Sequence, residues 1–200
     1  MTIKNVIFDF GGVLVDWNVR YLLKDYFKTE AETMAFLNKI SFEEWNSSLD
    51  WGYPFAKSIV ELQEKFPEYF DLFQRFYDDW EQMLGGCFTK TVALIEKLKE
   101  DGYALYGLTN WSAETFPIAY NKYPVFKNFD AIAVSGAEKL AKPDERFYRI
   151  LLDRYDLNPE ECIFIDDRQD NIETANKLGI HGIVFDNEDT IEAKVYAALK

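Results

Sequence analysis

Four places in this sequence carry polar side chains of the kinds that act on phosphoryl groups. Three of them follow short apolar runs and one precedes a proline: Asp9, Thr109, the pair Asp166-Asp167, and Lys142. We expect the apolar runs to be parallel strands, whose carboxyl ends meet at one edge, where open α/β sheets bind their ligands. Three carboxylates, one hydroxyl and one ammonium at that edge suit a divalent metal ion together with a phosphoryl group.

Asp9 is the candidate nucleophile of this set. A carboxylate can attack phosphorus and form an aspartyl-phosphate, which divides one difficult displacement into two easier steps. Asp166 and Asp167 can hold Mg²⁺ opposite Asp9, and the main-chain carbonyl of Gly11 could supply a further ligand. The metal ion would shield the nucleophile from the negative phosphoryl oxygens.

The remaining candidates would bind the substrate. Lys142 could neutralise both the nucleophile and the phosphoryl group, and Thr109 could donate a hydrogen bond to a phosphoryl oxygen. Trp111, after the Thr109 strand, and Trp51, in a turn at 50–53, could form walls of the pocket, although Trp51 could also pack among neighbouring helices. Each polar residue alone fits turn or capping chemistry, and their shared position at strand ends favours a site.

The overall composition narrows the classes of function. The 200 residues carry a net charge of −13, which argues against nucleic acid and anionic membranes as partners, because both bind basic faces. No apolar run is long enough for a membrane helix, and the N-terminus shows no secretory signal. Cys87 and Cys162 fit no metal or redox spacing, so we expect two buried thiols in a soluble cytoplasmic protein.

The elements that must position these residues alternate along the chain. We predict strands at 3–9, 103–109, 131–134, 162–166 and 183–185, and helices at 89–100, 144–156, 169–178 and 189–199. This alternation implies an α/β fold, with a Rossmann-like parallel sheet covered by helices on both faces. The only histidine, His181, precedes the last predicted strand and is expected to be a surface or loop residue away from the strand ends, so the chain lacks the residues for a Ser-His-Asp or Cys-His mechanism.

Residues 17–83 have a different character. They hold half of the aromatic residues and no strand-like run, and we predict helices near 19–27, 30–38, 41–48, 54–66 and 68–83. Large aromatic side chains can fill the thin core of a small helical bundle. We therefore predict an α/β catalytic core at 1–16 and 84–200, with an all-helical cap domain at 17–83 inserted after the first strand.

The ordered set of strand-end residues resembles the haloacid dehalogenase superfamily over the whole chain. The segments 8–13, 108–110 and 141–144 most resemble a subgroup that includes bacterial α-D-glucose-1-phosphate phosphatases. The resemblance implies Mg²⁺ as the cofactor, Asp9 as nucleophile and metal ligand, and Asp166 and Asp167 as the metal end of the site.

The same resemblance assigns the binding residues. It makes Lys142 the charge-balancing residue, and Thr109 and Asn110 the contacts to phosphate and substrate. The aligned carboxylate four residues beyond Asp167 is here Asn171, which weakens a metal role at that position. The implied function is a Mg²⁺-dependent phosphatase that acts on a small phosphorylated metabolite such as a sugar phosphate, as a monomer or a homodimer.

Gly11 is the main departure from the superfamily pattern. Phosphatases of the superfamily usually carry a second aspartate there, which protonates the leaving group and then activates water. General acid and base catalysis is worth about 10²–10⁴ in rate. Glycine at this position leaves three interpretations open: a leaving group that needs little protonation, a cap residue or water that does this work, or a weak or inactive relative.

Three other functions remain possible on these residues. A 2-haloacid dehalogenase would use Asp9 without a metal ion, but we would expect a basic or aromatic residue near Gly11 to hold the halide. A binding or regulatory module would keep the pocket without turnover. A receiver-like signalling domain fits Thr109 and Lys142, but it does not fit the large helical insertion.

Overall fold

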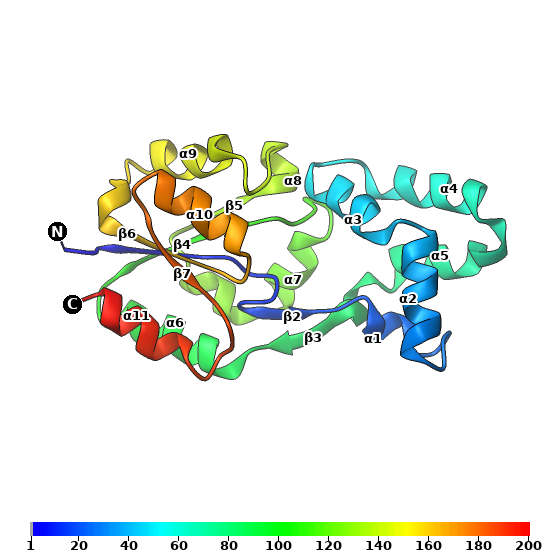
Figure 1. The fold of residues 1–200 in the computed structure, drawn as a ribbon, viewed down its shortest axis with the longest axis horizontal. Coiled ribbons are helices and arrows are strands. Elements are labelled where there is room, and N and C mark those ends of the chain that lie inside the picture. The colour runs from blue at the N-terminus through cyan, green and yellow to red at the C-terminus, as the bar shows by residue number, and fades with distance from the viewer. Residues whose placement is uncertain (1) are drawn as a thin grey trace.

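A five-stranded parallel sheet forms the centre of the protein in the computed structural model, which describes residues 2–200 (Figure 1). Met1, the first residue of the predicted core segment 1–16, lies outside the described residues. The strand order is β5-β4-β1-β6-β7. The strands are β1 (Asn5–Phe8), β4 (Ala104–Thr109), β5 (Ala131–Val134), β6 (Cys162–Asp166) and β7 (His181–Val184).

The central strand β1 is apolar throughout because both faces of the sheet are covered. Val6 and Phe8 belong to the hydrophobic cluster on one face, whereas Ile7 belongs to the cluster on the other face. β1 pairs in parallel with β4 and β6, so that Asn5 lies opposite Ala104 and Cys162. Parallel strands buried on both faces read as continuous apolar runs, as this one does.

Helices cover the two faces of the sheet (Figure 1). α6 (Thr89–Glu100) and α11 (Ile191–Ala198) contribute to the first cluster, and α9 (Glu145–Arg154) and α10 (Gln169–Lys177) to the second. Shorter elements complete the connections: α7 (Phe116–Lys122), α8 (Ser135–Glu138), and 3₁₀ helices at Pro124–Asn128 and Pro159–Glu161. The predicted α/β fold is confirmed.

A group of helices between the first and second core strands extends to one side of the sheet (Figure 1). They are α1 (Arg20–Leu23), α2 (Glu30–Lys39), α3 (Phe42–Asp50), α4 (Phe55–Lys65) and α5 (Phe70–Asp78), with 3₁₀ helices at Pro67–Tyr69 and Trp80–Met83. Phe36, Phe73 and Phe76 are buried against one another in their core. We call α1 to α5 the helical insertion.

A two-stranded antiparallel ribbon connects the helical insertion to the core, and it was not predicted. β2 (Val15–Trp17) carries the chain out and β3 (Leu84–Cys87) brings it back. Trp17, the predicted first residue of the cap domain, therefore ends a strand. Strands of three and four residues, one of them containing two glycines, leave no alternating pattern to detect.

Two helix predictions in the insertion were wrong in their bounds. The predicted helix 19–27 is only α1, because Leu22 and Leu23 are buried whereas the residues at 24–26 are exposed. The predicted helix 68–83 divides into three pieces, and the chain turns after α5 to bury Trp80. His181 is exposed as expected, and it begins the edge strand β7.

The two thiols differ in burial. Cys162 is buried as expected, whereas Cys87, in the ribbon strand β3, is half-buried. Burial raises the pKa of both thiols to about 11, so both are protonated at neutral pH. Among residues 2–200, we find no helix with the length and hydropathy needed to cross a membrane.

Candidate functional site

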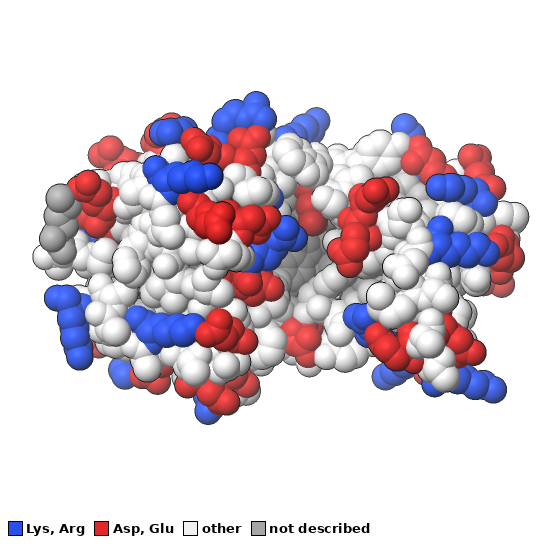
Figure 2. Space-filling model, in the orientation of Figure 1, with Lys and Arg blue, Asp and Glu red and all other residues white. Residues whose placement is uncertain are grey.

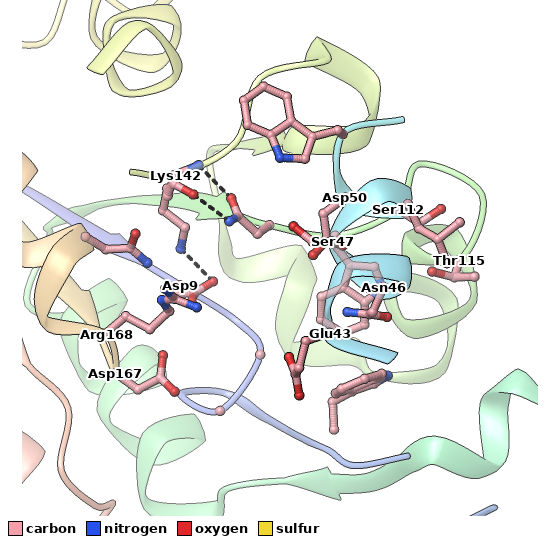
Figure 3. Close-up of a pocket in the computed structure, with 18 of the residues that line it drawn as sticks. Asp9, Glu43, Asn46, Ser47, Asp50, Ser112, Thr115, Lys142, Asp167 and Arg168 are labelled. Carbon is pink, nitrogen blue, oxygen red and sulfur yellow. Dashed lines mark hydrogen bonds and ion pairs between the residues drawn. The ribbon is translucent and has the colours of Figure 1, made fainter. Parts of the chain in front are cut away.

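A cavity of about 520 Å³ lies between the carboxyl edge of the sheet and helix α3 of the insertion. Figure 2 shows the surface hollowed at this junction, with acidic side chains on both sides of the hollow. The residues that line the cavity from the core include Asp9, Gly11, Asn110, Lys142 and Asp167. From α3, Glu43 and Asp50 face them (Figure 3).

One buried ammonium bridges two buried carboxylates at the end of the sheet. Lys142 Nζ lies 2.9 Å from Asp9 Oδ1 and 2.6 Å from Asp166 Oδ2. The side chains of Lys142 and Asp166 are 1% and 0% exposed, so neither charge is screened by water. The structure thus brings together three predicted site residues from three separate parts of the sequence.

The pKa values in this bridge are set by burial and by the charges themselves. Burial raises the pKa of Asp9, and the nearby Lys142 only partly offsets this rise. Burial alone would lower the pKa of Lys142, but the two carboxylates outweigh it and keep the ammonium pKa above its usual value. Lys142 is therefore a permanent positive charge beside Asp9.

Asp166 is fully occupied by hydrogen bonds. Its Oδ1 accepts from the backbone N–H of Arg168 at 2.8 Å and from Asn171 Nδ2 at 2.9 Å. Its Oδ2 accepts from Lys142 Nζ at 2.6 Å and from Asn171 Nδ2 at 3.0 Å. A carboxylate offers about four acceptor positions, so Asp166 must release one of these bonds before it can coordinate a cation.

Asp167 is the more open member of the acidic pair, because it is exposed and lines the cavity. Its pKa is raised, first by burial of the carboxyl group and then by the charge of Asp166. Single oxygens of Asp9, Asp166 and Asp167 lie within 4.8 Å of one another. Hard oxygen ligands and an excess of negative charge fit Mg²⁺, which favours such ligands.

Two glycines follow the nucleophile candidate and have different roles. Gly12 has a φ of +76°, and a Cβ at this position would lie 2.8 Å from Asp167 Oδ2, so a side chain there would collide with the acidic pair. A Cβ at Gly11 would meet no atom within 4 Å among the described residues. Gly11 therefore leaves open space two residues from Asp9.

The predicted substrate-binding residues at the end of β4 occupy different environments. Thr109 is fully buried and does not line the cavity, and its hydroxyl has no hydrogen-bond partner within residues 2–200. Asn110 does line the cavity, but its amide is engaged: Nδ2 donates to the Lys142 carbonyl at 2.9 Å and Oδ1 accepts from the Lys142 N–H at 2.8 Å. Asn110 thus positions the lysine backbone.

The two predicted tryptophans both line the cavity. Trp51 directly follows α3 and is 44% exposed, so it stands at the rim. Trp111 is buried, with its ring 6.0 Å from that of Trp80. Its indole Nε1 lacks a hydrogen-bond partner in the part of the chain that the structure describes, which leaves one donor available beside the cavity.

Two carboxylates of α3 were not singled out from the sequence. Glu43 is exposed, whereas Asp50, the last residue of α3, is half-buried. Burial raises the pKa of Asp50 to about 7, against the opposing charge of Lys142. The sequence signal closest to Asp50 is the predicted helix break at Trp51 and Gly52, but the pattern does not show that the preceding carboxylate faces the core.

Curated relatives include a phosphatase and a dehalogenase. The chain is 28% identical over 190 residues to the sesquiterpene phosphatase astK of Aspergillus oryzae, covering 91% of this chain and 89% of the relative. It is 27% identical over 106 residues to (S)-2-haloacid dehalogenase 4A of Burkholderia cepacia, covering 53% of this chain and 46% of that enzyme.

Solved structures share the fold and provide a magnesium-bound neighbour. A HAD-like family hydrolase of Porphyromonas gingivalis superposes with a TM-score of 0.76 at 25% identity, with both chains covered completely. The magnesium complex of the HAD family enzyme bt-2542 of Bacteroides thetaiotaomicron gives a TM-score of 0.73 at 22% identity, covering 92% of this chain and 94% of the other.

The family model described as haloacid dehalogenase-like hydrolase matches residues 6–185. With the sheet, the acidic strand ends and the buried lysine in place, the chain belongs to the haloacid dehalogenase-like hydrolases, and it is an enzyme of that hydrolase family.

Proposed function

We propose that the protein is a Mg²⁺-dependent phosphatase that hydrolyses a small phosphorylated metabolite through a phosphorylated Asp9. The observation that carries this proposal is the buried Lys142 ammonium between Asp9 and Asp166, with Asp167 beside them at the cavity. This arrangement holds a carboxylate nucleophile next to a fixed positive charge and to ligands for a divalent cation.

The Asp9 carboxylate is oriented by the backbone N–H of Phe10 and by Lys142. Its Oδ1 accepts the N–H of Phe10 at 2.6 Å and lies 2.9 Å from Lys142 Nζ. Attack by a carboxylate oxygen of Asp9 forms a bond to phosphorus and breaks the bond from phosphorus to the leaving-group oxygen. A water oxygen then attacks phosphorus, the bond to Asp9 breaks, and inorganic phosphate leaves.

Three further residues assist this displacement. The hydroxyl of Thr109 is buried behind the cavity lining and has no partner within residues 2–200, so it would donate only to a phosphoryl oxygen that enters past that lining. Lys142 balances the negative charge that collects between nucleophile and phosphate. Asn110 keeps Lys142 in place through the paired bonds to its backbone. Mg²⁺, held by Asp9, Asp167 and the Asp166 side of the site, would neutralise the phosphoryl oxygens during attack.

We also propose that residues 17–83 act as a cap on a catalytic core made of residues 1–16 and 84–200. The support is the position of α3, which closes one side of the cavity, and the narrow ribbon of β2 and β3 that joins the insertion to the core. Closure over a bound substrate would exclude water from the reaction.

A sugar phosphate fits the lining of the cavity. A volume of about 520 Å³ suits a small molecule. Asn46 and Ser47 of α3, together with the free indole donor of Trp111, offer polar contacts for hydroxyl groups. The relative that is named a sesquiterpene phosphatase makes an apolar phosphate ester the main competing substrate.

Phosphate release from a panel of substrates tests the proposal. The panel contains sugar phosphates, an acyl phosphate, a prenyl phosphate and p-nitrophenyl phosphate, each with Mg²⁺ and with a chelator, and the Asp9→Asn variant is the blank. We expect Mg²⁺-dependent release that disappears in the blank. No release from any substrate would refute the phosphatase, and chloride release from a 2-haloacid in the chelator would then establish the dehalogenase alternative.

A further inference from the structure

We propose that Asp50, at the end of α3, is the general acid and then the general base of the reaction, supplied by the helical insertion across the cavity from Asp9. This inference rests on the proposed phosphatase function and goes beyond it, because it names the residue that transfers the proton. It also chooses among the three interpretations that Gly11 leaves open.

The position of Asp50 is the first support. Figure 3 shows its side chain on α3 turned into the cavity, toward the side occupied by Asp9 and Lys142. The charge of Lys142 acts on the Asp50 carboxyl group, so the two lie within electrostatic reach. A leaving-group oxygen of a substrate attacked by Asp9 would lie between the core and α3.

The anchoring of Asp50 to the core is the second support. The backbone turns after α3 at Gly52, which has a φ of +85°. A Cβ at Gly52 would lie 2.6 Å from the carbonyl oxygen of Gly136 in α8, so the two backbones touch there. This close approach holds the end of α3, and Asp50 with it, at a defined place on the core.

The empty space at Gly11 is the third support. The core offers no side-chain carboxylate at this position, and a Cβ there would meet nothing within 4 Å in residues 2–200. A leaving group or a water molecule can therefore occupy this space. The proton must then come from another wall of the cavity, and α3 forms that wall.

The charged groups around the cavity distinguish Asp50 from its neighbours. Those that face the cavity besides Asp50 are Asp9, Glu43, Lys142, Asp167 and Arg168. Lys142 is bound to carboxylates, and Arg168 is paired with Asp170 at 2.8 Å. Burial raises the pKa of Asp50 to about 7, where a carboxyl group can both give and take a proton at neutral pH. Glu44 is exposed on the same helix and does not line the cavity, so it provides a matched control.

Asp50 gives one proton in the first step and recovers one in the second. As Asp9 attacks and the bond from phosphorus to the leaving-group oxygen breaks, protonated Asp50 gives its proton to that oxygen, and the alcohol leaves. The Asp50 carboxylate then takes a proton from the water whose oxygen attacks the phosphorylated Asp9. The bond to Asp9 breaks, inorganic phosphate is released, and Asp50 is protonated again.

Comparing two leaving groups tests this role. The full-length wild type, Asp50→Asn, Glu44→Gln and the double variant Gly11→Asp/Asp50→Asn are mixed rapidly with p-nitrophenyl phosphate or with an alkyl phosphate in Mg²⁺. The nitrophenolate anion leaves without protonation, so Asp50→Asn should release one nitrophenol for each active site at the wild-type rate. Turnover after this burst should be about 10²-fold slower or more, because water activation is lost.

The alkyl phosphate requires protonation, so Asp50→Asn should show no burst with it and a similar loss of turnover. Glu44→Gln should stay within about threefold of the wild type, and adding Gly11→Asp should raise the turnover of Asp50→Asn at least tenfold. The proposal is overturned if Asp50→Asn turns over alkyl phosphate at the rate of Glu44→Gln, or if its nitrophenol burst slows as much as its turnover. A wild type that releases no phosphate refutes the phosphatase itself.

Discussion

Replacing Asp50 by asparagine should stabilise the folded protein at pH 8 even though it slows turnover. Burial raises the pKa of Asp50 from 3.8 to about 7, so the folded protein holds a proton that the unfolded chain releases. The burial of Asp50 therefore costs no stability below pH 4, and this cost grows as the pH rises to about 7, because in this range the unfolded state binds fewer protons at Asp50 than the folded state does. Asparagine has nearly the same shape and carries no charge.

The size of the effect follows from the same pKa difference. The interval between 3.8 and about 7 corresponds to at most about 4 kcal/mol, at 1.36 kcal/mol for each pKa unit. Asp50 is only half-buried, so solvent screening should reduce the gain at pH 8 to about 1–2 kcal/mol. For a chain of this size, the melting temperature would rise by roughly 2–8 °C.

Thermal denaturation at pH 4 and pH 8, in a chelator to exclude metal binding, measures this difference. The melting temperature of Asp50→Asn should exceed that of the wild type at pH 8 and approach it at pH 4. Glu43→Gln, which removes an exposed carboxylate from the same helix, should match the wild type at both pH values. An Asp50→Asn difference that is the same at pH 4 and pH 8 would refute the reasoning.

Three other predictions follow from the geometry. Lys142→Met leaves the buried carboxylates of Asp9 and Asp166 without their cation. It should lower the free energy of unfolding, measured by urea denaturation, by about 3–5 kcal/mol. A loss below about 1 kcal/mol would contradict the buried ion pairs between Lys142 and the two carboxylates. In the same assay, Gly52→Ala should lower the free energy of unfolding by at least about 1 kcal/mol more than Gly102→Ala does. The two glycines have similar φ values, +85° and +88°, but only Gly52 lies against another backbone. Equal losses of stability in the two variants would exclude this contact. Mg²⁺ at 100 times its dissociation constant should stabilise the wild type by about 2.7 kcal/mol. Asp167→Asn should need a higher Mg²⁺ concentration for the same rise in melting temperature. An unchanged dependence on Mg²⁺ concentration would show that Asp167 does not bind the ion.

The strands that carry the site could be predicted because they are buried on both faces. The runs that end at Asp9, Thr109 and Asp166 are continuous and apolar, and the sheet places their carboxyl ends side by side. Lys142 follows no predicted strand, and the resemblance to the superfamily is what predicted it as the charge-balancing residue beside Asp9. The pattern could not predict the hydrogen-bond partners of these side chains. Examples are the four hydrogen bonds that Asp166 accepts and the bond from the Asn110 amide to the Lys142 backbone.

The contribution of the helical insertion could not be predicted from local patterns. Asp50 is an acidic residue at a helix end, which is ordinary in a sequence, and only the packing of Gly52 on Gly136 shows that it faces the core. The ribbon of β2 and β3 is likewise too short for a periodic signal. Both the orientation of Asp50 and the pairing of β2 with β3 depend on contacts between residues far apart in the sequence, which no short window of sequence contains.

Phosphate on Asp9 during turnover would be direct evidence that this carboxylate is the nucleophile. The wild type is mixed with p-nitrophenyl phosphate and Mg²⁺, quenched with acid during turnover, digested and analysed by mass spectrometry, with Asp9→Asn treated in parallel. We expect one phosphoryl group on the peptide that contains Asp9 and none in the variant. Turnover by the wild type with phosphate on another residue, or turnover that persists in Asp9→Asn, would contradict it.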